Sequence, residues 1–180
     1  MIGNHSNTLS CGSEKGFTLV EMIIVISMIA VLAAIALPRL MDTQDNAHDA
    51  TVAGVGGALA TAVIMVRSQW LANNVAQAVD VVSGFGAEDV ATSSDGWPTD
   101  AGQGAGSNHS AVMSSGDRCT RVWRALLVAN APRVSASAAA GPDYLVDTTG
   151  GNCRYTYQRN AKSNNIIYDA RTGEVITTIN

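Results

Sequence analysis

The sequence predicts an α+β fold, in which one long N-terminal α-helix packs on the small antiparallel β-sheet of a globular head. Two observations predict this fold class. A helix-compatible apolar pattern extends from residue 17 to about residue 80, whereas short runs of aromatic and β-branched residues follow from residue 144 onward. The chain has 180 residues, 47% of them apolar and 14% charged. This composition fits a single modest domain with an additional apolar segment.

Residues 17–37, FTLVEMIIVISMIAVLAAIAL, form the only long apolar run of the chain and carry one charge, that of Glu21. As a helix this run would be roughly 31 Å long, which is about the thickness of one bilayer core. Lys15 lies just before it, and a positive flank holds that end of a span in the cytoplasm. We therefore predict that residues 17–37 span a membrane with the N-terminus inside.

Glu21 is the unusual residue of this segment. A carboxylate near the bilayer centre costs about 2.5 to 3.5 kcal/mol, and intramembrane acids usually mark a function. One alternative is that Glu21 lies among the lipid headgroups, or is protonated, in a simple membrane anchor. Cleavage at the small residue Gly16 would retain the apolar run, whereas an ordinary secretory signal is cut after its apolar stretch.

Residues 15–21, KGFTLVE, resemble the class III signal of type IV prepilins and related pseudopilins. In that family a membrane peptidase cuts after the glycine and methylates the new N-terminal amine. The resemblance implies that residues 1–16 are a leader and that Phe17 becomes the methylated N-terminus. It also implies that Glu21 pairs with an α-amino group at position 17, in its own subunit or in a neighbour, and that a pair between subunits sets the axial register of a filament.

Pro38 follows the apolar run directly. A proline inside a helix costs about 3 kcal/mol, so the residues alone favour a helix that stops at the membrane surface. The family resemblance instead implies a long, bent helix that continues to about residue 80. The pattern beyond Pro38 remains helix-compatible, and one of its faces is apolar and expected to pack on the sheet. That face comprises Val52, Val55, Leu59, Val63 and Val66.

Three glycines, Gly54, Gly56 and Gly57, interrupt this second half of the helix. Each costs up to about 1 kcal/mol relative to alanine in a helix interior. They permit close helix packing, are simply tolerated, or mark a weak place where the helix extends under tension. The sequence leaves these interpretations open.

Residues 81–180 are expected to form the globular head. Within it, residues 83–116 are rich in Gly, Ser, Thr, Asp and Asn, and predict a long, irregular, exposed variable loop. Asp95, Asp100 and Asp117 could together bind calcium, but their spacing matches no recognisable calcium loop. We therefore predict no metal site and no cofactor.

The C-terminal part is expected to contain a short helix and a sheet. Residues 117–130 predict the helix, with Trp123 in the core, and the runs from residue 144 predict about four antiparallel strands that end in a hairpin. Cys11 would leave with the leader. For an exported domain, the two remaining thiols, Cys119 and Cys153, favour a disulfide over a metal site. Pilins similarly enclose a C-terminal region with a disulfide, which here would comprise residues 119–153.

No enzyme and no nucleic-acid partner is predicted. The formal charge is −4 and the arginines are scattered, so no basic stripe is present for nucleic acid. Of the three histidines, His5 would leave with the leader, and neither His48 nor His109 lies in a recognisable nucleophile motif. We expect both to be surface histidines.

The resemblance implies a structural subunit of a type IV pilus. A prepilin peptidase would process it in the inner membrane of a Gram-negative bacterium. A platform protein and an assembly ATPase would then polymerise it through its helix into an extracellular homopolymeric filament for adhesion, biofilm formation or motility. Three segments, DGWPT, CTRVWRALL and CRYTYQ, are similar to the mannose-sensitive haemagglutinin (MSHA) branch of the family.

Three alternatives share parts of this interpretation: a pseudopilin of type II secretion, a minor pilin and a membrane-anchored binding domain. The disulfide and the lack of a clear calcium loop favour a pilus over a pseudopilin. An anchored domain would have no need of Glu21 or of a cleavage site at Gly16.

Overall fold

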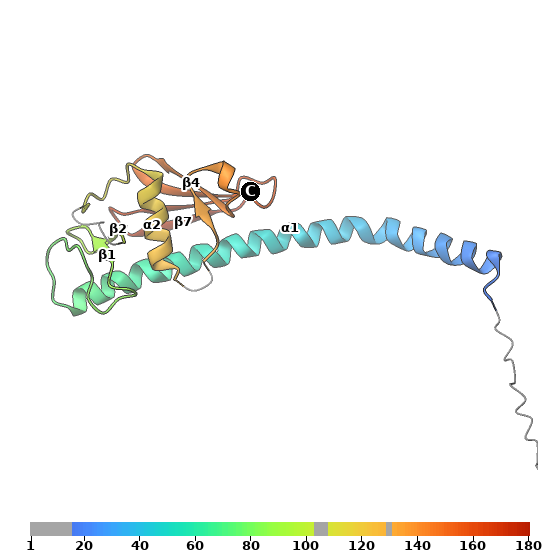
Figure 1. Cartoon of the computed structure of the whole chain (residues 1–180), viewed down its shortest axis with the longest axis horizontal. Helices are drawn as coiled ribbons and strands as arrows, with labels where there is room; N and C mark the ends of the chain where they lie inside the picture. Colours follow the sequence, from blue (N-terminus) through green and yellow to red (C-terminus); the bar gives the residue numbers. More distant parts are fainter. Residues whose placement is uncertain (1–15, 103–107, 129–130) are drawn as a thin grey trace, which may run out of the picture. The chain divides into compact units, whose positions relative to one another are not determined.

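The computed structural model describes residues 16–102, 108–128 and 131–180 (Figure 1). The chain forms two compact units, residues 1–43 and residues 44–180, and one helix, α1 (Leu19–Ala72), contributes to both. The remaining elements all lie in the second unit. They are β1 (Val90–Thr92), β2 (Pro98–Ala101), α2 (Gly116–Leu126), β3 (Val134–Ser135), the 3₁₀ helix η1 (Ala138–Ala140), β4 (Tyr144–Thr149), β5 (Asn152–Tyr157), β6 (Asn165–Asp169) and β7 (Glu174–Thr178).

The helix α1 continues through Pro38 and ends at Ala72, earlier than the end near residue 80 that the sequence suggests. Its end is a Schellman motif. Asn74 adopts a left-handed conformation with φ of 54°, its N–H donates to the carbonyl of Leu71, and the N–H of Val75 donates to that of Trp70. These bonds satisfy carbonyls that the helix would otherwise leave without partners. The Asn73-Asn74 pair was the available signal for this stop.

The head contains a five-stranded sheet in the order β3-β4-β5-β6-β7. β4 to β7 are antiparallel neighbours, as expected, and β6 and β7 form the predicted C-terminal hairpin. β3 is a fifth strand that the sequence analysis missed, and it pairs with β4 in parallel. With two residues it is too short to give a periodic pattern.

The core lies between one face of this sheet and the helices. Val52, Leu59, Val63 and Val66 of α1 are fully buried and belong to the same apolar cluster as the sheet residues. The expected packing of this stripe on the sheet is therefore confirmed. The sheet contributes Tyr144 and Val146 from β4, Cys153, Tyr155 and Tyr157 from β5, and Ile166 and Tyr168 from β6.

The amphipathic helix α2 covers another part of the core. Ser115 precedes the helix as its N-cap, and its side chain accepts a hydrogen bond from the N–H of Asp117. Trp123 is fully buried, as expected, with its ring centroid 4.5 Å from that of Tyr155. The indole N–H of Trp123 donates to the carbonyl of Pro132, so this large side chain is buried without an unsatisfied donor.

The prediction of an irregular, exposed loop at residues 83–116 is wrong for residues 90–92 and 98–101, and residues 103–107 of it lie outside the described residues. β1 and β2 form an antiparallel pair in it, and both strands are buried along their whole length. The hydroxyl of Tyr168 donates to the carbonyl of Pro98 at 2.7 Å. Long-range contacts of this kind bury a polar sequence that composition alone assigns to the surface.

Candidate assembly site

The first described residues form an exposed, apolar segment. Gly16, Phe17 and Thr18 precede the helix, and the side chain of Phe17 is 77% exposed. The large apolar side chains of α1 between Leu19 and Met41 are all exposed as well. The most apolar 18-residue window of α1 has a mean hydropathy of 2.7 and contains no buried residue, so α1 has the length and composition of a membrane span.

Glu21 forms a capping box with Thr18 at the start of α1. The backbone N–H of Thr18 donates to Oε2 of Glu21 at 3.2 Å, and the N–H of Glu21 donates to Oγ1 of Thr18 at 3.2 Å. Reciprocal bonds of this kind satisfy two helix N–H groups that lack helical partners. The sequence analysis missed this role, although Thr-Leu-Val-Glu contains its Thr-x-x-Glu signature.

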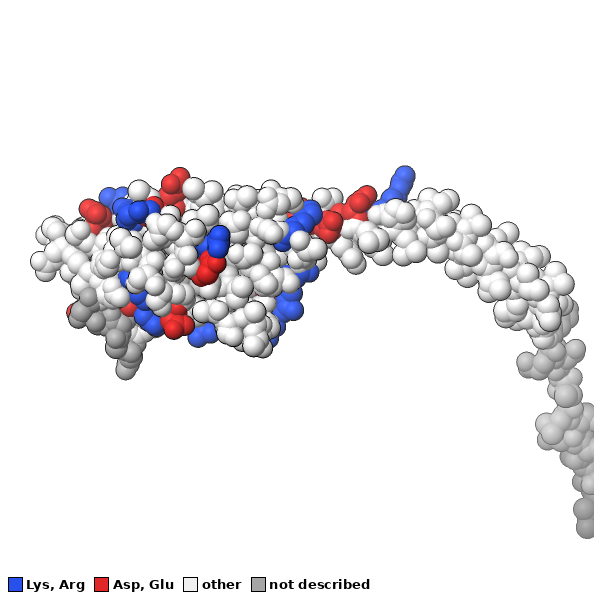
Figure 2. Space-filling model, turned by 90° about the horizontal axis from the view of Figure 1, so that it is seen from above, with Lys and Arg blue, Asp and Glu red and all other residues white. Residues whose placement is uncertain are grey.

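Charged residues flank the apolar run of α1 on both sides. Between Met22 and Pro38 the chain has no charged residue, and Arg39 is the next ionisable side chain after Glu21. In Figure 2 this apolar part of the chain is uniformly white, whereas Lys, Arg, Asp and Glu are scattered over the head. Glu21 forms no ion pair within the part of the chain that the structure describes. Its carboxylate is exposed and accepts hydrogen bonds from Thr18. It can therefore pair with a cation from another molecule.

In the head, the predicted disulfide is present between Cys119 of α2 and Cys153 of β5, with Cα atoms 5.5 Å apart. Both residues are fully buried. The hydroxyl of Tyr155 donates to the carbonyl of Cys119 at 2.9 Å, and burial raises the pKa of this tyrosine. The disulfide and this hydrogen bond attach α2 to the middle of the sheet.

A buried arginine holds the segment before α2. Arg118 is 4% exposed, and its guanidinium donates to the carbonyls of Thr99, Ser110 and Val112 at 2.8 to 3.1 Å. A longer bond of 3.4 Å reaches the carbonyl of Asn108. Burial lowers the pKa of Arg118 from its ordinary value. One side chain of α2 therefore fixes four points of the segment that sequence reasoning treats as a free loop.

Asp100 is bound by arginine rather than placed to bind a metal ion. It is 2% exposed and accepts two hydrogen bonds from Arg121, at 2.8 and 3.0 Å. The hydrogen bonds that Arg121 donates to Asp100 raise the pKa of Arg121. Within residues 16–102, 108–128 and 131–180, no group of three or more His, Cys, Asp or Glu side chains is arranged to hold a metal ion.

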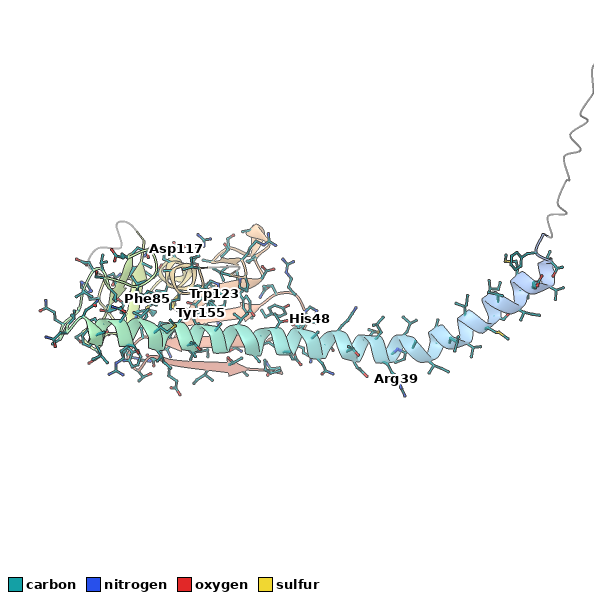
Figure 3. All side chains as sticks on the ribbon, turned by 90° about the horizontal axis from the view of Figure 1, so that it is seen from below. Arg39, His48, Phe85, Asp117, Trp123 and Tyr155 are labelled. Carbon is teal, nitrogen blue, oxygen red and sulfur yellow. A yellow bond between two sulfur atoms is a disulfide. The ribbon has the colours of Figure 1, made fainter. Side chains whose placement is uncertain are left out.

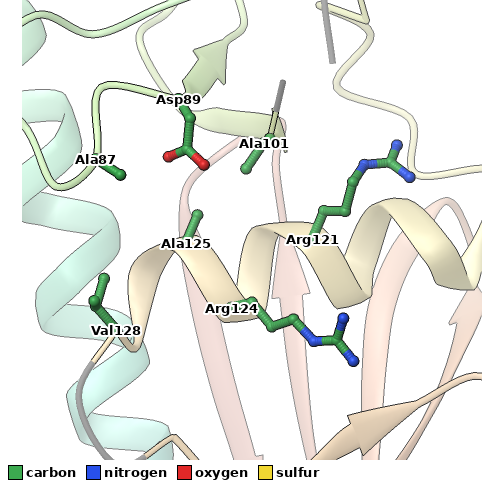
Figure 4. A pocket seen from close by; sticks show the side chains of 8 residues that line it. Ala87, Asp89, Ala101, Arg121, Arg124, Ala125 and Val128 are labelled. Carbon is green, nitrogen blue, oxygen red and sulfur yellow. The ribbon is translucent and has the colours of Figure 1, made fainter. Parts of the chain in front are cut away.

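A shallow pocket of about 260 Å³ lies beside α2 (Figure 4). Its lining is mostly small and apolar, with alanines such as Ala87 and Ala125, and with Asp89, Arg121 and Arg124 as its charged members. The guanidinium of Arg121 is already engaged by Asp100. The pocket brings together no nucleophile and general base, so it gives no support to an enzymatic reaction.

The two histidines of the head are partly exposed, and each has specific partners. Nδ1 of His48 lies 2.8 Å from the hydroxyl of Tyr157. Nδ1 of His109 lies 2.9 Å from the carbonyl of Thr92, and its Nε2 lies 3.2 Å from Asp80. Both side chains therefore connect segments that are distant in sequence.

A polar cluster next to His48 attaches α1 to the rest of the head. We call this cluster of Asp49, Lys162 and Asn164 the polar latch. Asp49 accepts hydrogen bonds from Lys162 at 2.8 Å and from Asn164 at 2.7 Å. Asn164 is fully buried and accepts a further hydrogen bond from the backbone N–H of Asn180. The latch therefore joins the helix, the segment before β6 and the last residue of the chain.

Replacing Asp49 by asparagine is expected to lower the melting temperature at pH 7 and to have little effect near pH 2. The hydrogen bond from Lys162 lowers the pKa of Asp49 from its ordinary value of 3.8. A carboxylate that is more acidic in the folded state contributes stability above its unfolded pKa, about 4, and loses that contribution as the pH falls through its folded pKa. Thermal unfolding of the full chain in mild detergent, followed by circular dichroism at several pH values, measures the effect.

The matched control for this prediction is Asp42→Asn, which removes an exposed carboxylate from the same helix. It should leave the melting temperature unchanged throughout. A deficit of the Asp49→Asn protein that is as large at pH 2 as at pH 7 would contradict a role for the charge of Asp49.

Comparison with known proteins supports the N-terminal segment as the recognisable part of the chain. The family model described as the prokaryotic N-terminal methylation motif matches residues 11–37. The chain is 47% identical over 57 residues to the major component of the type IV narrow pilus of Thermus thermophilus. The aligned region covers 29% of this chain and 49% of that protein. It is also 47% identical over 51 residues to the type IV major alpha-pilin of Moraxella bovis, and this aligned region covers 28% of this chain and 32% of that protein.

The N-terminal part of the chain is thus homologous to type IV pilins and carries their methylation motif. The matched region spans about half the length of the Thermus relative and about a third of the Moraxella one. No solved structure matches the chain. The head, with its long N-terminal helix on a mainly antiparallel sheet, has the architecture of the type IV pilin fold.

Proposed function

We propose that this chain is a structural subunit of a type IV pilus and that α1 is both its membrane anchor and its polymerisation element. The observation that carries the proposal is the match of residues 11–37 to the N-terminal methylation motif. Its relatives named above are major components of such pili. In this proposal a prepilin peptidase cuts after Gly16 and methylates the amine of Phe17.

The exposed apolar surface of residues 17–41 explains how one helix can serve both in the membrane and in the filament. In the membrane these side chains contact lipid, and in a filament they contact the helices of other subunits. Lipid tails and apolar side chains are similarly apolar, so the transfer has little hydrophobic cost and depends on packing and polar contacts. Glu21 supplies the polar contact, since its exposed carboxylate can pair with the methylated amine of a neighbouring subunit.

The finer parts of the proposal concern partners, location and branch. The subunit waits in the inner membrane of a Gram-negative bacterium, and an assembly ATPase and a platform protein then add it to an extracellular filament. Of the pilus branches we propose MSHA, because the segments DGWPT, CTRVWRALL and CRYTYQ of this chain resemble it. The latter two begin at the disulfide cysteines, Cys119 of α2 and Cys153 of β5. Attachment to surfaces and biofilm formation are the corresponding roles.

Intact mass spectrometry of filaments sheared from the native host tests the proposal. The expected mass is that of residues 17–180 with one added methyl group, and reduction should add two hydrogens as the disulfide opens. Membranes from the same cells serve as the comparison, because they should contain the processed subunit before its assembly. A full-length chain in membranes, together with filaments that lack it, would overturn the proposed function.

A further inference from the structure

A second pocket, of about 360 Å³, lies on the head next to the end of α2. Its walls come from α2, from β3 with the residues around it, and from the turn between η1 and β4. Two arginines, Arg124 and Arg133, line it, and among the described residues no acidic side chain does. The uncharged lining includes Ser135, Ala140 and Pro142. We call this site the arginine pocket.

Arg124 brings to the pocket a positive charge without an acidic partner. Trp123 and Tyr155, which Figure 3 labels next to each other, pack together in the core, whereas Arg124, the next residue of α2, is exposed. Its guanidinium donates one long hydrogen bond of 3.4 Å to the carbonyl of Val134, which also lines the pocket, and in Figure 4 it points away from Asp89. Within the described part of the chain Arg124 forms no ion pair. Most of its five N–H donors therefore remain available.

Arg133 adds a second positive charge, which its acidic neighbour does not fully balance. Nε of Arg133 lies 3.6 Å from Oδ2 of Asp143, and the side chain is 67% exposed. The same carboxyl group accepts a closer hydrogen bond from Nε of Arg159, at 2.6 Å. One carboxylate thus faces two guanidinium groups, in a chain whose formal charge is −4. Positive charge is therefore in excess at the arginine pocket.

Backbone hydrogen bonds hold the walls of the pocket in place. The N–H of Arg133 donates to Oδ2 of Asp143 at 2.9 Å, and the carbonyl of Arg133 accepts from the N–H groups of Asp143 and Tyr144 at 2.8 and 3.1 Å. Oγ of Ser135 accepts a hydrogen bond from the N–H of Ser137 at 3.0 Å, which leaves the hydroxyl hydrogen of Ser135 for another acceptor. A pocket with walls held in this way loses little freedom when a ligand binds.

We propose that the arginine pocket binds an acidic sugar of the hexuronate type, a ring with one carboxylate and several hydroxyl groups. Guanidinium groups bind carboxylates through paired, charge-assisted hydrogen bonds, and Arg124 and Arg133 supply two of these groups. Ser135 offers a hydrogen-bond partner to a sugar hydroxyl, and Ala140 and Pro142 offer carbon to the C–H face of the ring. The volume lies within the range of small-molecule pockets, about 300 to 1,000 Å³.

The form of the pocket favours a sugar over a simple anion or an acidic peptide. An inorganic anion would fill a small part of the 360 Å³ and leave the apolar walls without a partner. An extended peptide binds along a free strand edge or a long groove, and β3, the strand at this edge of the sheet, has two residues. The site itself does not depend on the proposed function. On a pilus it would recur in every subunit, so that weak single sites would act together, and this consequence alone rests on the proposed function.

Titration of the full-length chain with tetragalacturonate, an oligomer of four acidic sugars, tests the inference. Isothermal titration calorimetry in an uncharged detergent measures the dissociation constant. The methyl ester of the same oligomer retains the rings and hydroxyl groups but lacks the charges. It should bind at least about tenfold more weakly, because hydrogen bonds to charged groups contribute more than neutral ones. Tetra-aspartate, which carries its carboxylates on a peptide, should also bind at least about tenfold more weakly.

Three variants assign the binding to the pocket. Arg124→Gln should weaken it about fivefold, the size expected for one exposed ion pair. Ala140→Leu retains every charge and places a larger side chain at an exposed lining position, so it should weaken binding at least as much. The control, Arg171→Gln, removes a half-exposed arginine from the turn between β6 and β7, outside the pocket, and should stay within about twofold of the wild type. Melting temperatures near that of the wild type show that the variants are folded.

Each contrary result overturns the inference. Absence of tetragalacturonate binding, or equal binding of the methyl ester or of tetra-aspartate, would exclude an acidic sugar as the ligand. Sodium acetate that displaces the oligomer better than sodium chloride at equal ionic strength would reduce the pocket to a site for simple anions. Unchanged binding by both Arg124→Gln and Ala140→Leu would place the sugar elsewhere on the chain. None of these results affects the proposed pilus function, which the mass of the filament subunit tests separately.

Discussion

Glu21→Gln is expected to be inserted into the membrane and processed like the wild type, but to yield at least about tenfold fewer filaments. In the proposed filament, the carboxylate pairs with the amine of Phe17 from a neighbour, away from water. Removing one partner of such a pair costs about 2 to 5 kcal/mol, and 1.4 kcal/mol is already a factor of ten. Filament yield after shearing, normalised to processed subunit in the membrane, measures the effect.

The capping box provides matched controls for this prediction. Glutamine can replace glutamate in a capping box, so Glu21→Gln removes the charge and retains the bonds with Thr18. Thr18→Ala retains the charge of Glu21 and removes the bond from the N–H of Glu21 to Oγ1 of Thr18, at a cost to the helix end of about 0.5 to 2 kcal/mol. We expect Thr18→Ala to assemble far better than Glu21→Gln. If the two variants lose filaments equally and are both processed, Glu21 acts through the helix end and not through its charge.

Removing the disulfide is expected to have the largest effect on the stability of the head. Cys119 and Cys153 are 34 residues apart in sequence, and closing a loop of this size contributes about 3.5 to 4 kcal/mol in the chain-entropy model. The double variant Cys119→Ala/Cys153→Ala avoids burying a polar group at these fully buried positions. Its free energy of unfolding, from urea titration of the full chain in detergent, should fall by about that amount.

Reduction of the wild type gives the control for the double variant. Reductant should lower the stability of the wild type to a similar extent and should leave the double variant unchanged. Tryptophan fluorescence can follow both, since Trp123 is buried against Tyr144 and Tyr155. A loss below about 1 kcal/mol would show that the hydrogen bond from Tyr155 to Cys119 and the surrounding packing hold α2 without the disulfide.

The parts of the fold that sequence reasoning predicts are those with a local periodic signal. The stripe from Val52 to Val66 has a helical period, and its members are buried as expected, apart from Val55, which is half-buried. The strands from Tyr144 onward have the composition and alternation of a half-buried sheet. In both cases one side of the element faces the core, and the spacing of apolar residues along the sequence shows which side that is.

The parts that sequence reasoning misses depend on contacts between distant residues. Nothing near Pro98 or Asp100 indicates that Tyr168 and Arg121, 70 and 21 residues away, bind them. Nor does the position of Arg118 on a short helix show that its guanidinium binds four carbonyls. The capping box of Glu21 is a different case, because its signature is local but a charged residue in an apolar run suggests a membrane role first.

The anchoring of the segment before α2 has a consequence for where the sequence of the head can change. Gly102 is held through its N–H, which donates to the carbonyl of Asp89, and Asn108 is held through the bond from Arg118. Both points are fixed by groups other than residues 103–107, so substitutions or insertions between them need not disturb β2 or α2. The core of the head can therefore stay constant while the sequence between these two points changes.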